Sequence, residues 1–179
     1  MSKEYALILG VSSGIGAACA KEFAKSGINI IGLYMRKPKD QIEKLNNEIL
    51  NYNVDSKLIK MNACNYEEME SLLSSEEFND VKIKVLIHSL AFGSMKPLIH
   101  SDKPKRLNKK NIDMTIDVMS NSLIYWSQSI YDNDSFIKGS QIIAMTSAGA
   151  RKQWLSYGAV SMSKAALSLI HISEPTRPY

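Results

Sequence analysis

The sequence predicts an α/β fold in which helices flank a doubly wound parallel sheet. Three observations carry this prediction. Short apolar runs alternate with segments of helical periodicity, a glycine-rich turn joins the first run to the first helix, and no proline- or glycine-rich linker divides the 179 residues. Because strands that alternate with helices form βαβ units, the sheet should be covered on both faces. Ligands are expected beyond the carboxyl ends of its strands.

The first part of the chain repeats a pattern of strand, turn and helix. A strand is predicted over 5–9, and a helix follows over 15–25, where apolar residues recur at helical spacing. Gly27 closes this helix, and a second strand over 29–34 leads to a helix over 39–50. Two parallel strands with a helical crossover therefore open the fold.

The same alternation continues to the end of the fold. Three more apolar runs predict strands, and two periodic stretches predict helices. The strands are expected over 57–61, 84–88 and 141–145, and the helices over 67–73 and 113–131. One domain with five strands is predicted.

Composition and charge narrow the class of protein. The chain is 45% hydrophobic with a net charge of +4, and no apolar stretch reaches the ~20 residues of a membrane span. There is no secretory h-region at the N-terminus. Cys19 and Cys64 lack metal-ligand spacing and a third partner. We expect a soluble cytoplasmic protein with reduced thiols, and without a metal, a nucleic-acid partner or a membrane partner.

Basic residues are concentrated between Lys96 and Lys110, where prolines and few large apolar residues predict a surface segment. Two interpretations remain open. The segment is a solvated loop, or it docks an acidic partner.

The first turn reads Gly10-Val-Ser-Ser-Gly14-Ile-Gly16. Glycines allow a sharp turn and close approach to a pyrophosphate, and the following helix offers free N–H groups and a positive dipole end. A tight turn with close helix packing also needs glycines, but this position in the first βα turn favours dinucleotide binding. The predicted contacts come from Gly10, Ser12, Ser13, Gly14, Ile15 and Gly16.

This G-x-x-x-G-x-G spacing resembles that of the short-chain dehydrogenase/reductase family, and the resemblance extends from about residue 3 to residue 169. It implies a Rossmann-like domain over 1–169 that binds a nicotinamide cofactor.

The end of the second predicted strand bears on the choice of cofactor. A site that prefers NAD usually has an acid there, ~20 residues after the glycines, but the sequence has Arg36 and Lys37. Arg36 can pair with a 2′-phosphate, and Ser12 and Ser13 can add hydroxyl donors. The alternative is a solvated basic turn before Pro38. NADP(H) is therefore predicted in preference to NAD(H).

The resemblance implies further cofactor contacts at the ends of two other strands. Asn62 and Ala63 stand where the family usually has an Asp beside a small apolar residue, near the adenine. His88 and Ser89 follow the fourth strand and are expected near the cofactor ribose.

Tyr157 and Lys164 are seven residues apart, which is two helical turns, so both lie on one face if a helix begins near Tyr157. A nearby ammonium lowers the pKa of a phenol and makes it a better proton donor or acceptor. Such a pair is common in any helix, but here it follows the fifth strand, with Ser147 just beyond that strand's end. The three residues are the predicted catalytic group.

The gap of six residues between Tyr157 and Lys164 is similar to that of the enoyl-acyl-carrier-protein reductases of this family, whereas most members have three. The sequence from His88 to Gly93, His-Ser-Leu-Ala-Phe-Gly, also resembles the His-Ser-Ile-Ala-Phe signature of that branch. Met119 stands where ordinary members have a catalytic Asn. These departures favour enoyl reduction over carbonyl reduction.

The resemblance implies a role for each residue. Tyr157 would hydrogen-bond the thioester carbonyl and stabilise the enolate, Lys164 would hold the nicotinamide ribose and tune Tyr157, and Ser147 could assist in binding the carbonyl. Many enoyl reductases have a second tyrosine in place of Ser147.

Residues 170–179 are expected to be a non-native tail. Their closing Ile-Ser-Glu-Pro-Thr-Arg-Pro-Tyr resembles translated sequencing-adapter sequence, whereas family members continue with further strands and a substrate loop. A naturally short protein is the alternative. Because the substrate loop is missing, the chain as printed is expected to be inactive.

The leading hypothesis is an NADPH-dependent reductase of 2-enoyl thioesters in fatty-acid synthesis. A 3-oxoacyl or other carbonyl reductase and a non-catalytic NADP(H)-binding regulator are the alternatives. Partners implied by the resemblance are an acyl thioester, with acyl carrier protein as a candidate carrier, and further copies of the full-length chain in a dimer or tetramer.

Overall fold

The computed structural model describes residues 3–170, which form two compact units. The first unit comprises residues 3–91 and 122–145, and the second comprises residues 92–121 and 146–170. The predicted tail over 170–179 lies outside the described residues except for Ile170.

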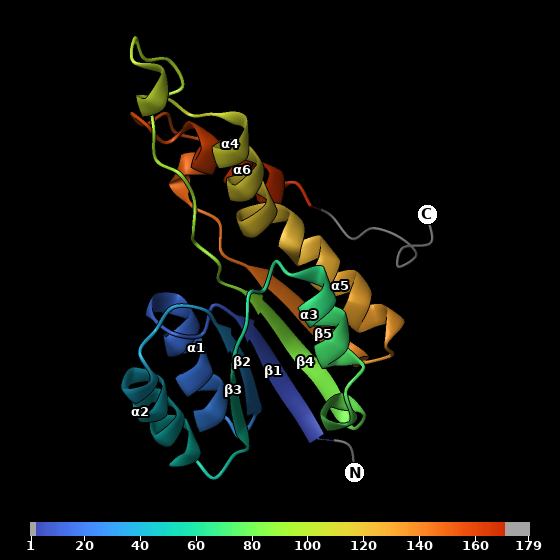
Figure 1. Cartoon of the computed structure of the whole chain (residues 1–179). Coiled ribbons are helices and arrows are strands. Elements are labelled where there is room, and N and C mark those ends of the chain that lie inside the picture. The colour runs from blue at the N-terminus through green and yellow to red at the C-terminus, as the bar shows by residue number, and fades with distance from the viewer. Residues whose placement is uncertain (1–2, 171–179) are drawn as a thin grey trace. The chain divides into compact units, whose positions relative to one another are not determined.

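The first unit contains a parallel sheet of five strands in the order β3-β2-β1-β4-β5 (Figure 1). The strands are β1 (Lys3–Leu9), β2 (Asn29–Tyr34), β3 (Ser56–Lys60), β4 (Val81–His88) and β5 (Phe136–Ala144). From β1 the chain proceeds outward to β3 and then returns to the other side of β1. The order therefore reverses between β1 and β4, where open α/β sheets bind their ligands. The prediction of a doubly wound sheet is confirmed.

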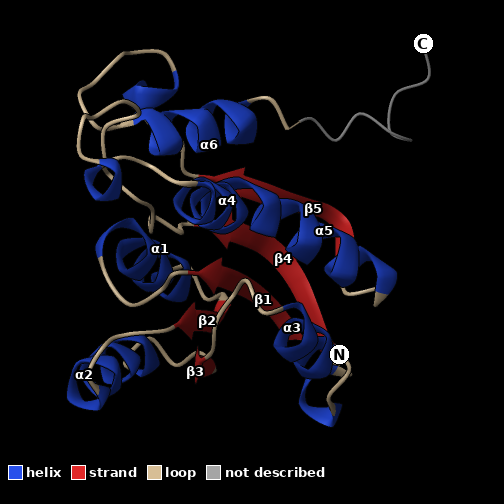
Figure 2. Ribbon diagram, turned by 45° about the horizontal axis from the view of Figure 1, so that its top comes forward, coloured by secondary structure: helices blue, strands red, loops and turns tan. Residues whose placement is uncertain are grey.

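Helices cover both faces of this sheet, with α1 and α2 on one side and α3 and α5 on the other (Figure 2). Their bounds are α1 (Gly14–Lys25), α2 (Lys39–Leu50), α3 (Tyr66–Leu73) and α5 (Ser122–Asp132). Ala6 and Ile8 of β1 pack in one buried cluster with Ala20 of α1 and Ile49 of α2. Because side chains alternate along a strand, the buried Leu7 lies on the opposite face. Burial on both sides explains why the strands are almost continuously apolar.

The second unit is built around α6 (Gly158–Ser168), which packs against α4 (Lys109–Ile116), the π-helical turn η3 (Asp117–Asn121) and the short turn η4 (Ala148–Ala150). A loop lies between residues 97 and 107, and the backbone N–H of Leu107 closes its base by donating to the carbonyl of Pro97 at 2.9 Å. The turn η2 (Lys103–Lys105) lies within this loop.

Several elements are longer than the sequence indicates. The helix predicted over 113–131 becomes α4, η3 and α5, and it begins at Lys109 because Asn108 caps it. The Asn108 side chain accepts from the backbone N–H of Asn111 at 2.9 Å, and the Asn111 side chain accepts in return from the N–H of Asn108. Strand β5 begins five residues before its predicted start, at Phe136, and contains Gly139 at φ +85°.

Among residues 3–170, no helix combines the length and the apolar character that crossing a bilayer would require.

Candidate active site

The glycine turn lies at the carboxyl end of β1, and two of its glycines are required by close backbone contacts. Gly10 has φ +92°, and a Cβ on it would lie 2.8 Å from the carbonyl oxygen of Ser89. A Cβ on Gly16 would lie 2.1 Å from the carbonyl oxygen of Gly10. No side chain larger than hydrogen fits at Gly16 without moving the turn.

Helix α1 begins at Gly14 directly after this turn. Ser13 is its N-cap residue, its hydroxyl does not cap the helix, and no acidic residue lies in the first turn. Ser13, Gly14 and Ile15 are exposed, whereas Ser12 is half-buried. These properties fit the predicted pyrophosphate site, because N–H groups at the start of the helix remain available to an anion.

The end of β2 is joined to the same turn. The backbone N–H groups of Gly10 and Val11 both donate to the carbonyl oxygen of Leu33 at 3.0 Å. Arg36, three residues further on, is exposed, and the Lys37 ammonium donates to the side chain of Gln41 at 3.4 Å. The predicted partner of a 2′-phosphate therefore follows a strand end that is hydrogen-bonded to the glycine turn.

Asn62 and Ala63 follow β3. The side chain of Asn62 accepts from the N–H of Cys64 at 3.1 Å and so shapes the turn. The carbonyl of Ala63 accepts from the indole N–H of Trp126, which is fully buried in α5, at 2.8 Å. Trp126 was not a predicted site residue, and it fixes the backbone at the position expected near the adenine.

His88 and Ser89 lie where β4 ends. The His88 side chain is completely buried, and its Nε2 lies 2.8 Å from the hydroxyl of Ser122 at the start of α5. The N–H of Ser89 donates to the carbonyl of Leu9 at 2.9 Å. His88 thus links the sheet to α5, while Ser89 places its backbone against the glycine turn. Direct contact of either side chain with the ribose stays a prediction.

Tyr157 and Lys164 lie on α6 in the second unit, as the spacing predicts. Tyr157 is the N-cap residue of α6, and Lys164 follows two turns later. The Lys164 side chain is buried, and this loss of solvent lowers the pKa of its ammonium group below the ordinary value. Val160, at the position that most family members use for tyrosine, is buried and cannot ionise.

Ser147 and Tyr157 converge on one residue, Gly149. The hydroxyl of Ser147 accepts from the N–H of Gly149 at 3.3 Å. A Cβ on Gly149 would lie 2.4 Å from Cε1 of Tyr157 and 3.3 Å from the Ser147 hydroxyl. The missing side chain at Gly149 therefore lets the phenol ring lie against this turn, close to the serine.

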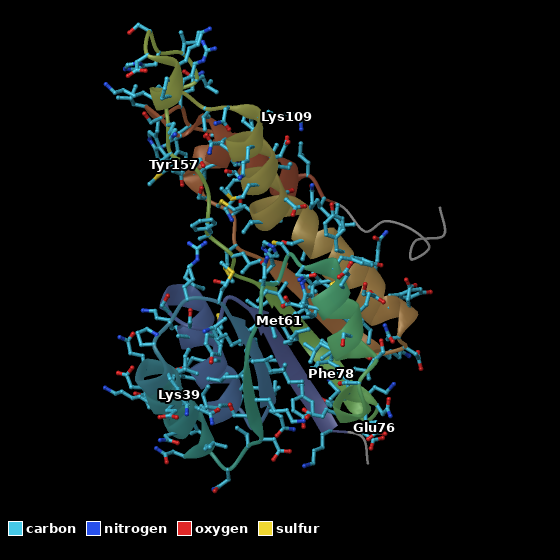
Figure 3. All side chains as sticks on the ribbon, viewed as in Figure 1. Lys39, Met61, Glu76, Phe78, Lys109 and Tyr157 are labelled. Atoms are coloured by element: carbon cyan, nitrogen blue, oxygen red, sulfur yellow. The ribbon has the colours of Figure 1, made fainter. Side chains whose placement is uncertain are left out.

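Two neighbouring residues in the sequence, Trp154 and Ser156, help to position Tyr157, which Figure 3 labels. Neither was among the predicted site residues. The Trp154 ring packs edge-on against the phenol with ring centroids 5.1 Å apart. Ser156 has φ +59°, a left-handed conformation that is strained for serine. A non-glycine residue at positive φ directly before a helix leaves no pattern in the sequence. The Trp-x-x-Tyr spacing was the only available signal.

Met119 lies within η3 and is 4% exposed. Its thioether can neither donate a proton nor relay one.

Neither Cys19 nor Cys64 forms a disulfide. Within the described range, no group of three or more His, Cys, Asp or Glu residues could hold a metal ion.

Comparison with known proteins identifies the family of the chain. Residues 10–171 match the sequence model of the family described as Enoyl-(Acyl carrier protein) reductase. The fold and the match define a protein of the short-chain dehydrogenase/reductase type. The chain belongs to the Enoyl-(Acyl carrier protein) reductase family.

One similar curated protein is a probable NADP-dependent mannitol dehydrogenase of Yarrowia lipolytica. It is 32% identical over 121 residues, which are 67% of this chain and 41% of the relative. The chain therefore spans less than half the length of that relative.

Solved structures share the fold. A short-chain dehydrogenase/reductase from Serratia marcescens superposes with a TM-score of 0.78 at 21% identity, covering 93% of this chain and 64% of that one. A 3-oxoacyl-[acyl-carrier protein] reductase from Brucella melitensis gives a TM-score of 0.75 at 17% identity, covering 94% and 67%.

Proposed function

We propose that the protein to which this chain belongs reduces 2-enoyl thioesters with NADPH. A nicotinamide cofactor held by the glycine turn and Arg36 would supply the hydride that the β-carbon of the substrate receives. Tyr157 donates a hydrogen bond to the thioester oxygen and stabilises the enolate, and the α-carbon then takes up a proton. Lys164 holds a positive charge near the phenol and favours its ionised form.

The observation that carries this proposal is the arrangement on α6. Tyr157 caps the helix and Lys164 lies two turns later, about 10 Å along the axis. Both side chains are long enough to approach one another across that rise. The Lys164 side chain is buried, so its charge would act on a developing phenolate with little screening by solvent.

The cofactor would be held in the first unit. Gly10, Gly14 and Gly16 with the start of α1 would bind the pyrophosphate, and Arg36 would bind the 2′-phosphate of NADP(H). The close contacts at Gly10 and Gly16 support this, because they give the turn the backbone approach that a pyrophosphate needs.

The deciding experiment compares two substrates in the longest form of the protein that its gene encodes. NADPH oxidation is followed with crotonyl and acetoacetyl thioesters side by side. We expect crotonyl thioester to be reduced with the higher kcat/KM. Preference for the acetoacetyl thioester would replace the proposal with carbonyl reduction.

Carbonyl reduction is the second candidate because of the contact between Ser147, Gly149 and Tyr157. A serine hydroxyl beside the phenol could hold a ketone oxygen while Tyr157 protonates the alkoxide. One similar curated protein is named as a probable mannitol dehydrogenase, and one protein of similar fold is named as a 3-oxoacyl-[acyl-carrier protein] reductase.

A charge reversal at Arg36 tests the cofactor. Arg36→Asp is expected to raise the Kd for NADPH by about tenfold or more and to change that for NADH little, because a phosphate partner becomes a repelling charge. Binding is measured by titrating nicotinamide fluorescence. Lys39→Asp is the matched control, since Lys39 is exposed and pairs with Glu43. Equal weakening of both cofactors by Arg36→Asp would reject the 2′-phosphate assignment.

A further inference from the structure

One face of α5 carries buried polar side chains. Ser122, Trp126 and Ser129 are spaced four and three residues apart, which places them on one side of the helix. Their exposed fractions are 0%, 0% and 4%. A helix that packs on a sheet normally buries an apolar stripe, and a buried hydroxyl or indole N–H is costly unless it is hydrogen-bonded. The partners of these three side chains therefore show what α5 holds in place.

Two of the three side chains fasten α5 to its neighbours. The Ser122 hydroxyl lies 2.8 Å from Nε2 of His88, the last residue of β4. Two turns later, the Ser129 hydroxyl donates to the Glu70 carboxylate on α3 at 2.5 Å. Figure 2 shows α3 and α5 on the same face of the sheet. Because the face is hydrogen-bonded on both sides of Trp126, the indole is held at a fixed place relative to β4 and α3.

Trp126 extends from this face to the turn between β3 and α3. Its indole N–H donates to the carbonyl of Ala63 at 2.8 Å. The Trp126 side chain is fully buried, so water has little access to replace the donor. Without the N–H, the Ala63 carbonyl would lose this partner and would have to turn toward another donor. The hydrogen bond therefore determines the orientation of the Ala63 peptide group.

The same turn adjoins the strand end that leads to Arg36. The N–H of Met61 donates at 2.9 Å to the carbonyl of Tyr34, the last residue of β2. Arg36, the predicted partner of the 2′-phosphate, follows two residues later. The turn predicted to lie near the adenine and the predicted phosphate partner thus follow two strands that are paired in parallel. The adenosine 2′-phosphate part of a cofactor would contact both.

We propose that Trp126 is a positioning residue for the adenosine end of the cofactor. It would touch no cofactor atom itself. Its hydrogen bond holds the Ala63 peptide group, and with it the surface against which the adenine would pack. The inference rests on the proposed function, since a nicotinamide dinucleotide must bind at this edge of the sheet. The nicotinamide end should not depend on Trp126, because its predicted contact, Lys164, lies on another element.

The test is Trp126→Phe in the longest form of the protein that its gene encodes. NADPH is titrated by nicotinamide fluorescence, and adenosine 2′,5′-bisphosphate and nicotinamide mononucleotide then compete with it as the two halves of the cofactor. We expect the Kd for NADPH and the inhibition constant of the adenosine bisphosphate to rise by about fivefold or more, because a hydrogen bond is lost and its acceptor is left without a donor. The inhibition constant of nicotinamide mononucleotide should change less than about twofold.

Two comparisons separate this effect from a general loss of packing. Benzothienylalanine, introduced at residue 126 by stop-codon suppression, keeps the shape of tryptophan and has sulfur in place of the N–H. It should reproduce the selective loss with a smaller shift of the urea midpoint than Trp126→Phe, because the core stays filled. Ile130→Val is the matched control, since it removes a methyl group from a fully buried residue of α5. It should lower the urea midpoint and leave all three binding constants within about twofold.

The competition distinguishes the possible outcomes. Equal weakening of both competitors would overturn the inference, since it would assign Trp126 to the stability of the fold alone. Unchanged affinity for the adenosine bisphosphate in the benzothienylalanine protein would overturn it as well. No acyl substrate is needed, so a preference for acetoacetyl thioester would contradict the proposed function and leave this result intact. A wild-type protein that binds neither NADPH nor either half would contradict both.

Discussion

Replacing Tyr157 with phenylalanine is expected to lower the turnover of a 2-enoyl thioester by about tenfold or more. The variant loses only the hydroxyl that donates to the developing enolate, and a tenfold loss corresponds to about 1.4 kcal/mol of transition-state stabilisation. The ring would keep its edge-on contact with Trp154 and its position against Gly149. Affinity for NADPH should therefore change little, because the residues predicted to bind its pyrophosphate and 2′-phosphate lie on other elements.

Steady-state kinetics and NADPH titration on the same preparation check this result. Tyr131→Phe removes a hydroxyl from an exposed residue of α5 and is the matched control. Full activity in Tyr157→Phe would remove this phenol from the mechanism. A parallel loss of cofactor affinity would indicate that the substitution acts on the fold rather than on the chemistry.

A single methyl group at Gly16 is expected to abolish cofactor binding. In Gly16→Ala the new Cβ would lie 2.1 Å from the carbonyl oxygen of Gly10, a distance that no relaxation of a flexible side chain can relieve. The backbone of the turn must move, at a cost of about 1–3 kcal/mol or more in folding stability. Moving the turn also displaces the N–H groups that would contact the pyrophosphate, so the Kd for NADPH should rise by at least about tenfold.

Urea denaturation and NADPH titration measure the two effects of Gly16→Ala independently. Ala18→Ser, an exposed change one half-turn further along α1, should leave both unaffected. Unchanged NADPH affinity in Gly16→Ala would mean that the cofactor does not use this turn.

The sequence predicted the strands and helices because each has a strong local pattern. The bounds of β2 and α2 agree with the prediction at both ends, since an apolar run and an apolar helix face define them. The start of α4 was missed because its cap uses asparagine at both positions, whereas the common capping box ends in Glu or Gln. The early start of β5 depends on Gly139 and on an irregular register with β4, which only the paired strands reveal.

The candidate site was predictable where its residues follow a family spacing and not where they depend on contacts across the fold. Ser147 and Tyr157 were expected together, and both contact Gly149. The hydrogen bond of Trp126 to Ala63 joins residues 63 positions apart. No local pattern encodes such a contact, because it depends on how α5 packs against the sheet.

The chain has two tryptophans, and each lies in a different unit. Trp126 is fully buried and donates to a backbone carbonyl beside the predicted adenine position, whereas Trp154 is 49% exposed and lies against Tyr157. An indole shielded from water emits at a shorter wavelength than one in contact with it. The protein therefore carries two separable intrinsic fluorophores, one beside the predicted nucleotide site and one beside the predicted catalytic phenol. Trp154→Phe would leave an emission spectrum that reports on the first unit alone.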